Sequence, residues 1–413
     1  MTLSRSARYI GMTCNILGHY DTALFGILTP FIATLFFNQS DPVTALIFTY
    51  GILFLGIIPK PFGALFFGWM GDYFGQKQAL SCSLTIMGTV TVLMGCLPTY
   101  SAVGIWSPIL LLAGRMLQGF CAVGETTGAS ILLLENTSQK QRSLMSSFYD
   151  ISSTAGAFMA SGLVSYLCLG GRLEENWRLL FWIGGLPAFF ALFLNTKHQT
   201  IKGLKSENQK WELIQILKDH RRVLVSIAIA SGFSYTTYAL AFTLMNGYVP
   251  LVTSLGTSDM MHINTFLLMI DVMLLPCFGY LAQKFGKEKI MLIGAFCSAI
   301  GAIPLFYCLS GASLPTVITI RFLIVFFGVA FAAPFHAWKL EHVPTKYRYT
   351  ILALGCTLGH QLIGAPTSAI CLWMYRFSKW VWAPGLYLML IGTLAGLVVY
   401  LHSAKLLRKA TIS

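Results

Sequence analysis

The sequence predicts an all-α polytopic membrane protein with twelve transmembrane helices in two pseudo-symmetric bundles of six. The first observation is composition: of 413 residues, 56% are hydrophobic and only 10% are charged, whereas a soluble domain carries about 25% charged residues. The second is a succession of apolar segments long enough to cross a bilayer. The third is that the positive charges between these segments fall mainly on one side.

Twelve apolar segments follow one another along the chain. They lie at residues 11–37, 44–70, 79–98, 108–134, 144–168, 177–195, 222–250, 260–282, 289–309, 315–337, 349–374 and 383–402. The longest polar connection divides them six and six. We therefore expect an N-terminal bundle at 1–195, a cytoplasmic central loop at 196–222, and a C-terminal bundle with a short tail at 223–413.

The 28 Lys and Arg residues are distributed unevenly over the loops. Most lie at the two ends of the chain, in the central loop, and in the loops that follow spans 2, 4, 8 and 10. The opposite loops contain only Arg172, Arg178, Arg376 and Lys379. This positive-inside pattern places both termini and the central loop in the cytoplasm. It also accounts for the net charge of +13 without a nucleic-acid partner.

Nothing in the sequence points to a cofactor, a metal or an enzyme. The ten cysteines include no Cys-x-x-Cys pair and fall mostly in apolar segments, so we expect packing residues rather than ligands or disulfides. No metal-ligand spacing, catalytic triad or phosphate-binding loop is visible. The first apolar segment contains Asp21 and is long enough to span, so we expect it to be retained rather than cleaved as a signal peptide.

A short polar turn occurs once in each half of the chain. In the first half it contains Gly68, Asp72 and Gly75, and in the second half Gly279 and Gly286 have the same spacing. Corresponding stretches of spans 4 and 10 are Arg115-Met116-Leu117 and Arg321-Phe322-Leu323. Two six-span halves with matching motifs in the same orientation are typical of transporters whose halves rock about a site near the midplane.

Further motifs run from span 1 to span 11. They are Tyr20-Asp21, Leu24-Phe25-Gly26, Pro61-Phe62-Gly63-Ala64, Arg115-Met116-Leu117-Gln118-Gly119-Phe120, Gly124-Glu125, Trp177-Arg178-Leu179-Leu180-Phe181, the stretch 341–350, and Gly364-Ala365-Pro366. With the duplicated turn they resemble the major facilitator superfamily, and within it the metabolite:proton symporters, which include proline/betaine, 2-oxoglutarate, citrate and shikimate transporters. The resemblance covers nearly the whole chain. It implies a secondary active transporter of the bacterial inner (plasma) membrane.

The chain departs from the family pattern at several positions. Gly18 and His19 stand where the family has a Glu and an aromatic residue. The first turn lacks two customary basic residues, and the second turn has Gln283 where the family has an acidic residue. Any contact made by the turns therefore depends mainly on Asp72.

Two carboxylates, Asp21 and Glu125, are predicted at similar depth within spans 1 and 4. A charge at bilayer depth costs roughly 3 kcal/mol or more unless it is paired or hydrated. Neighbouring carboxylates disfavour each other's ionisation, so one of them can hold a proton near neutral pH. We expect at least one to couple transport to protons, with Asp21 preferred. The alternative is a polar contact between helices.

The candidate substrate-binding residues are Arg115, Tyr20, His19, Arg321 and Asp271. The planar guanidinium of Arg115 suits a carboxylate, although a structural Arg bonded to backbone carbonyls is the alternative. His19, next to Tyr20, could line the cavity or serve as a packing histidine. Arg321 and Asp271 belong to the second half, where a structural, charge-balancing pair is the preferred interpretation.

A cytoplasmic gate is predicted around the first turn. Asp72, at a helix end, can accept hydrogen bonds from the free N–H groups at the start of span 11. Charged residues nearby would add salt bridges that form in one state only and so bias alternating access. The alternative is that they only set topology. The predicted gate residues are Gly68, Asp72, Gly75, Lys77, Arg142, Glu341 and Arg348.

The sequence thus predicts a proton symporter for a small carboxylate or zwitterion, such as an organic acid, proline or betaine. The expected partners are this solute, protons and the lipid bilayer, and we expect a monomer. A uniporter or exchanger would have the same fold without proton coupling. A membrane sensor derived from a transporter is an alternative of another class.

Overall fold

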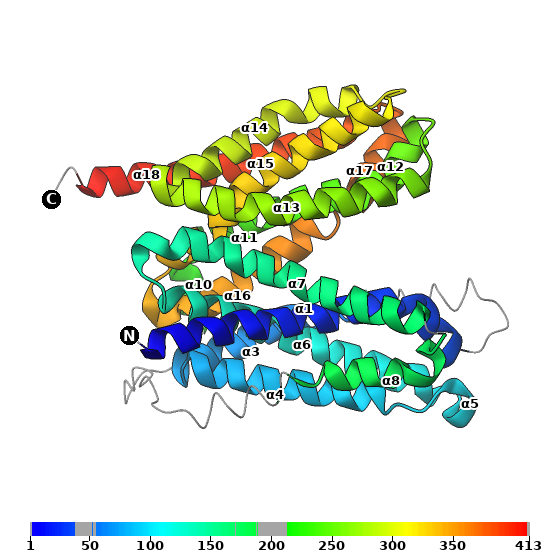
Figure 1. The fold of residues 1–413 in the computed structure, drawn as a ribbon. Coiled ribbons are helices and arrows are strands. Elements are labelled where there is room, and N and C mark those ends of the chain that lie inside the picture. The colour runs from blue at the N-terminus through cyan, green and yellow to red at the C-terminus, as the bar shows by residue number, and fades with distance from the viewer. Residues whose placement is uncertain are drawn as a thin grey trace. The chain divides into compact units, whose positions relative to one another are not determined.

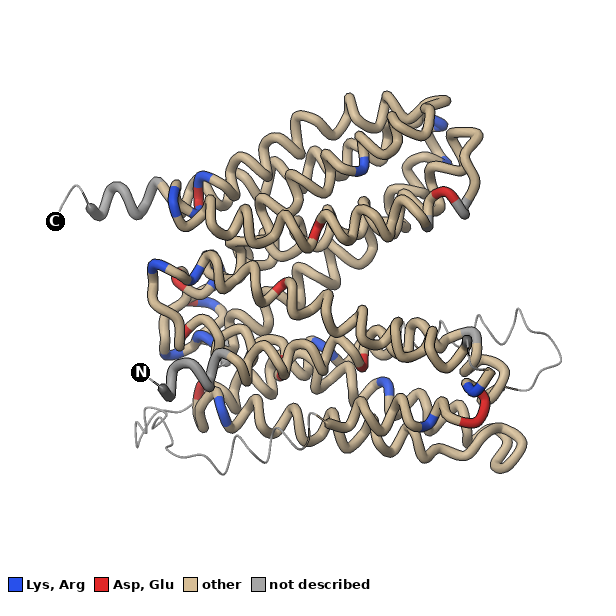
Figure 2. Tube along the Cα trace, viewed as in Figure 1, with Lys and Arg blue, Asp and Glu red and all other residues tan. Residues whose placement is uncertain are grey.

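The computed structural model describes residues 2–37, 52, 55–169, 171–186, 188 and 213–410. All the regular structure in these residues is helical (Figure 1). Parts of the predicted second and sixth spans and most of the predicted central loop lie outside the described residues. Figure 2 shows the Lys, Arg, Asp and Glu residues gathered mainly at helix ends, with few charges midway along a helix.

The helices of the first half follow the predicted spans closely. They are α1 (Thr2–Phe36), α3 (Lys60–Tyr73), α4 (Gln76–Gly95), α5 (Tyr100–Val103), α6 (Trp106–Glu135), the 3-10 helix η1 (Gln139–Gln141), α7 (Arg142–Leu169) and α8 (Leu173–Ile183). In the core, Tyr20 and Phe25 of α1 cluster with Trp177 and Phe181 of α8. This cluster fixes which face of α1 is turned towards its neighbours.

Two predicted spans of the second half contain π-helical segments. The helices are α10 (Leu213–Asp219), α11 (Arg221–Tyr238), the π-helix η2 (Ala239–Leu244), α12 (Met245–Val252), α13 (Thr257–Phe285), α14 (Lys287–Tyr307), α15 (Leu314–Glu341), the 3-10 helix η3 (Thr345–Tyr347), α16 (Arg348–Gly359), the π-helix η4 (His360–Gly364), α17 (Thr367–Ser378) and α18 (Ala383–Ala410). The spans predicted as 222–250 and 349–374 are therefore interrupted midway, at η2 and η4.

Eight stretches of the described helices are long and apolar enough to cross a membrane. They coincide with predicted spans 3, 4, 5, 7, 8, 9, 10 and 12. The other four predicted spans correspond to α1, to α3 and the residues before it, to α8 and the residues after it, and to α16, η4 and α17. The described helices thus fit the twelve-span order.

The two polar turns are bent in the same way. Gly75 and Gly286 each precede the first residue of a helix and have φ angles of 107° and 98°. Such angles strain any residue with a side chain, which explains why glycine stands at both places. The duplication seen in the sequence therefore extends to backbone geometry.

The chain forms two compact units whose boundaries do not coincide with the two predicted bundles. Unit 1 comprises Met1–Thr137, Tyr149–Leu213 and Pro344–Leu354, and unit 2 comprises Ser138–Phe148, Ile214–Val343 and Gly355–Ser413. The start of α7, from the first half of the sequence, therefore belongs to unit 2, and the start of α16, from the second half, belongs to unit 1. The two exchanged segments occupy corresponding positions in the sequence repeat.

Candidate functional site

A chain of buried hydrogen bonds in unit 1 begins at Asp21. Thr91 Oγ1 of α4 donates to Asp21 Oδ1 at 3.0 Å, and Gln118 Nε2 of α6 donates to Oδ2 at 2.8 Å. Arg115 Nη1 in turn donates to Gln118 Oε1 at 2.7 Å. Both oxygens of the Asp21 carboxylate therefore accept a hydrogen bond. The Gln118 amide links this carboxylate to the guanidinium of Arg115, which lies one turn before Gln118 on α6.

Arg115 does not have the structural arrangement considered from the sequence, in which it would bond backbone carbonyls. Its guanidinium is buried and lies over the Phe25 ring, 4.3 Å from the centroid. Its hydrogen bond goes to a side chain rather than to a backbone carbonyl. The Arg115 Nε has no hydrogen-bond partner among the described residues, so the guanidinium keeps a free donor.

Glu125, two turns after Gln118 on α6, packs against α1 at Gly18. A Cβ atom at position 18 would lie 2.6 Å from Glu125 Cδ and 2.8 Å from Oε2. Both Glu125 and Asp21 are 1% exposed. Glu125 Oε1 accepts no hydrogen bond from the described residues. The carboxylates of Asp21 and Glu125 thus both lie at one turn of α1. The Asp21 carboxylate is hydrogen-bonded, whereas Glu125 has an oxygen without a hydrogen-bond donor.

His19 and Tyr20 are engaged in packing contacts. The Tyr20 hydroxyl donates to the Leu180 carbonyl at 2.9 Å, and the side chain is fully buried in the core cluster. His19 Nδ1 lies 2.9 Å from the Asn15 carbonyl one turn earlier, and the side chain is half-buried. Tyr20 therefore does not line a cavity, because packing against α8 turns it into the core.

Arg321, in unit 2, binds backbone and amide oxygens. Its Nη2 donates to Ala241 O at 2.8 Å, Asn246 Oδ1 at 3.2 Å and Asn264 Oδ1 at 2.6 Å, and its Nη1 donates to Met260 O at 3.3 Å. The side chain is 0% exposed. None of these bonds goes to Asp271, so the predicted pair is not formed among the described residues. The structural interpretation of Arg321 fits these contacts.

Asp72 makes the contact expected at the start of span 11. Its Oδ1 accepts from Tyr349 N at 2.8 Å and its Oδ2 from Thr350 N at 2.9 Å. Gly68 allows this approach, because a Cβ there would lie 2.7 Å from Thr350 Cα. Burial raises the pKa of Asp72 to about 6, although the Thr350 and Tyr349 hydrogen bonds and the Arg348 charge oppose the shift.

The same segment of unit 1 is held by two further contacts. Arg348 forms an ion pair with Glu135 at the end of α6. The Tyr349 hydroxyl donates to the carbonyl of Gly124, the residue before Glu125. The exchanged segment Pro344–Leu354 therefore contacts both the polar turn and the backbone that carries the buried acid.

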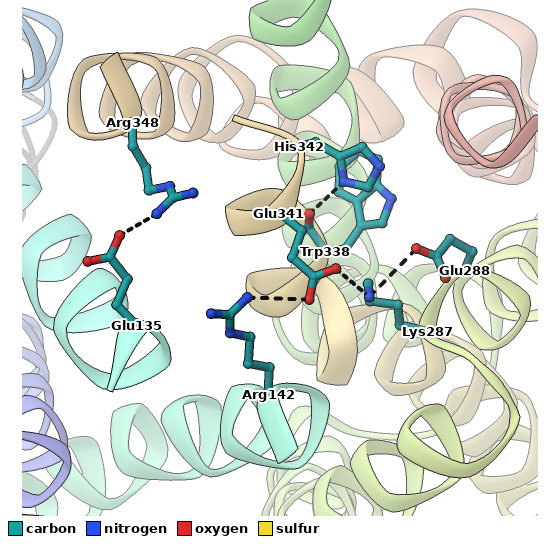
Figure 3. A network of polar contacts seen from close by, with 8 residues as sticks. All are labelled: Glu135, Arg142, Lys287, Glu288, Trp338, Glu341, His342 and Arg348. Atoms are coloured by element: carbon teal, nitrogen blue, oxygen red, sulfur yellow. Dashed lines mark hydrogen bonds and ion pairs between the residues drawn. The ribbon is translucent and has the colours of Figure 1, made fainter. Parts of the chain in front are cut away.

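Unit 2 contains a corresponding ion-pair cluster (Figure 3). Glu341 lies 3.9 Å from Arg142 Nη1 and 2.5 Å from Lys287 Nζ, and Lys287 lies 3.8 Å from Glu288. A Cβ at Gly279, the counterpart of Gly68, would lie 3.2 Å from Leu144 Cα at the start of α7. Of the charged residues predicted for the gate, Lys77 is the one whose side chain makes no hydrogen bond or ion pair among the described residues.

Several residues of these networks are not predicted from the sequence. Thr91 and Gln118 are neutral and gave no signal as partners of Asp21, although Gln118 stands in a quoted motif. Glu135 could have been found, because Glu135 and Arg142 have the same seven-residue spacing as Glu341 and Arg348. No group of three or more potential metal-ligating side chains occurs within the described part of the chain.

Comparison with known proteins identifies the family. Residues 11–354 match the model of the Major Facilitator Superfamily. The chain is 27% identical to the "Putative proline/betaine transporter" of Staphylococcus haemolyticus over 93% of this chain and 84% of that protein. It is also 27% identical to the "Glycine betaine/proline/ectoine/pipecolic acid transporter" of Dickeya dadantii, over 96% and 83%.

Solved structures of low sequence identity share the fold. The proton:xylose symporter bound to 6-bromo-6-deoxy-D-glucose superposes with a TM-score of 0.71 at 17% identity, covering 96% of this chain and 94% of that one. A major facilitator transporter in an outward conformation gives 0.73 at 12% identity, covering 95% and 98%. The predicted resemblance and the twelve-helix fold class are therefore confirmed. The chain belongs to the Major Facilitator Superfamily.

Proposed function

We propose that this transporter is a proton symporter for a small zwitterionic solute and works by alternating access. The observation that carries the proposal is a pair of buried carboxylates at one turn of α1. Asp21 of α1 has two hydrogen-bond donors, and Glu125 of α6, which packs against Gly18, has an unpartnered oxygen. A buried carboxylate that is fully hydrogen-bonded is stable as an ion, whereas one that lacks donors is stabilised by a proton. The two acids thus suit different roles.

Glu125 is the proton carrier in this proposal. Asp21 accepts from Thr91 and Gln118 and is linked to Arg115, so it remains ionised. Glu125 sits beside this ion, which disfavours a second negative charge. The sequence favoured Asp21 as the carrier, but the hydrogen bonds of Asp21 favour Glu125.

The solute follows from the relatives and from Arg115. Proline and betaine, named for the relatives, carry a carboxylate and a substituted ammonium group. The free Arg115 Nε is a buried donor that a solute carboxylate can satisfy. A solute that brings its own positive charge also avoids placing an unbalanced anion at bilayer depth.

The cytoplasmic gate consists of the exchanged segment Pro344–Leu354 and its contacts in unit 1. Asp72 holds the first N–H groups of α16, and Tyr349 contacts the carbonyl that precedes Glu125. Release of this segment opens the cytoplasmic side, and a change of charge at Glu125 reaches it through Gly124. We place the gate, the central loop and both termini in the cytoplasm of a bacterial cell, and the protein acts as a monomer.

Uptake by proteoliposomes tests this function. The purified chain is reconstituted, and uptake of labelled glycine betaine, proline, citrate and 2-oxoglutarate is measured with and without an imposed pH gradient, acidic outside. The proposal expects accumulation of a zwitterion that collapses when the gradient is dissipated. Uptake that ignores the gradient identifies a uniporter, and uptake that requires internal solute identifies an exchanger.

A further inference from the structure

The two π-helical segments of unit 2 lie midway along their spans. η2 (Ala239–Leu244) interrupts the span formed by α11 and α12, and η4 (His360–Gly364) interrupts the span formed by α16 and α17. α11 packs against η4. π-Helical turns are rare and often occur at functional sites, because they leave backbone carbonyls without their usual partners. Many membrane transporters bind their solutes near irregular, discontinuous helices at mid-depth.

Arg321 supports one of these segments. Its Nη2 donates to the carbonyl of Ala241 within η2 and to Asn264 of α13. Because the guanidinium is fully buried, it fixes η2 relative to α13. The π-helical segment is therefore held by specific contacts within unit 2.

Two tyrosines on α11 remain exposed at the same depth. Tyr235 is 38% and Tyr238 is 46% exposed. A tyrosine hydroxyl facing hydrocarbon at mid-depth would have no partner, and membrane tyrosines that face lipid are enriched at the interfaces instead. Tyr235 and Tyr238 therefore fit a polar, solute-accessible face of α11 better than a lipid-facing one.

Ionisable groups from two other helices accompany the tyrosines. The ring of His360, the first residue of η4, stands edge-on to Tyr235 with centroids 3.9 Å apart. The Tyr235 ring packs directly against Gly364, where a Cβ atom would lie only 2.6 Å from the ring. Asp271, near the middle of α13, interacts electrostatically with Tyr238. A buried carboxylate of α13 thus lies at the same depth as the rings of Tyr235, Tyr238 and His360.

We propose that Tyr235, Tyr238, Asp271 and His360 form a binding site for a substituted ammonium group. Aromatic faces attract quaternary and other substituted ammonium ions, and a nearby carboxylate supplies the opposite charge. The site takes the trimethylammonium group of a betaine or the ring ammonium of proline. This inference rests on the proposed function, since it specifies how unit 2 recognises the zwitterion.

Competition between two solutes of the same shape tests the site. Glycine betaine and 3,3-dimethylbutanoate share a carboxylate and a trimethyl head, but only the betaine head is charged. Each is used to inhibit counterflow of labelled glycine betaine in proteoliposomes, which requires no proton gradient. The wild type is expected to bind glycine betaine about tenfold or more tightly than the uncharged-head analogue.

Variants locate the discrimination. In Tyr238→Leu and in Asp271→Asn the ratio of the two inhibition constants should fall towards one, whereas Tyr238→Phe, which keeps the ring, should retain it. Tyr280→Leu, an exposed tyrosine near the end of α13, is the matched control. Asp271→Asn keeps the test decisive if Tyr238→Leu does not fold.

The outcomes separate this inference from the proposed function. A wild-type ratio that persists in both Tyr238→Leu and Asp271→Asn overturns the ammonium site while leaving zwitterion transport intact. A wild type that transports a carboxylate but neither zwitterion overturns both the ammonium site and the solute class. A normal ratio with uptake that ignores a pH gradient supports the site and overturns only the proton coupling.

Discussion

The carboxylate of Glu125 occupies the space that a side chain at position 18 would need. A Cβ on Gly18 would lie 2.6 Å from Glu125 Cδ and 2.8 Å from Oε2. Position 18 is also where the family pattern has a Glu. Glycine at position 18 leaves room for this carboxylate of α6.

Gly18→Ala should impair coupled uptake. The added methyl group must displace the Glu125 carboxylate, which is almost fully buried and has little room to move. We expect the rate of uptake driven by a pH gradient to fall about tenfold or more. Gly26→Ala on the same helix is the control, since no atom lies within 4 Å of a Cβ there. Equal rates in the two variants would show that the space at Gly18 is irrelevant to coupling.

Lower pH should stabilise the docked state, in which Pro344–Leu354 is held by Asp72. The pKa of Asp72 is raised to about 6 by burial, from a value of 3.8 in water. The docked state therefore binds the proton more tightly. Its added stability is complete below about pH 3.8, declines as pH rises, and is lost above about pH 6. Hydrogen exchange of the 344–354 peptide, corrected for intrinsic rates, should show more protection at pH 5 than at pH 7.5.

Asp72→Asn provides the control for this pH dependence. The amide can still accept a hydrogen bond from Tyr349 or Thr350 but does not titrate in this range. Protection in the variant should not change between pH 5 and 7.5, because the amide stays uncharged throughout. A pH dependence that survives in Asp72→Asn would assign it to another group.

Exchanging the charges of Glu135 and Arg348 should separate pairing from topology. The side chains are 29% and 14% exposed, so the pair is partly shielded from water. We expect Glu135→Arg or Arg348→Glu alone to reduce uptake about tenfold, because each places like charges together. The double variant should recover most of the activity. Lys346→Glu, which changes a neighbouring charge in the same loop, should have little effect on uptake. A similar loss of uptake in this variant would indicate that the charges of the loop act by setting topology.

Arg321→Lys should destabilise unit 2. Lysine cannot reproduce the planar set of donors that reaches Ala241, Asn246 and Asn264. Leaving these buried acceptors unsatisfied is expected to cost about 3 kcal/mol, seen as a fall of about 5 °C or more in Tm. The same change at the exposed Arg376 serves as the control. Equal Tm values for the two variants would argue against the structural role of Arg321.

The sequence was sufficient for the order of spans, the duplication and the partner of Asp72. These follow from patterns that are local, such as apolar length, glycine spacing and the free N–H groups of a helix start. Gly68, Asp72 and Gly75 could be interpreted because a repeat and a known motif constrain them. The direction of Tyr20 could not be predicted, because it depends on how α1 is rotated against α8.

Neutral partners and helix irregularities also escaped prediction. Thr91 and Gln118 bind Asp21 only because α4 and α6 present them at one level, which no spacing within a single helix reveals. η2 contains neither Gly nor Pro, so its π-helical form depends on tertiary contacts such as that of Arg321. The exchange of 138–148 and 344–354 between the compact units likewise arises from packing rather than from hydrophobic pattern.

Glu125→Gln tests the central claim most directly. In proteoliposomes with an imposed pH gradient, the variant should lose accumulation of the zwitterion, because glutamine carries no exchangeable charge. Counterflow at equal pH on both sides should continue, because solute binding and alternating access remain. Glu174→Gln, at an exposed position on α8, is the control and should accumulate solute normally. Normal accumulation by Glu125→Gln would contradict the assignment of Glu125 as the proton carrier.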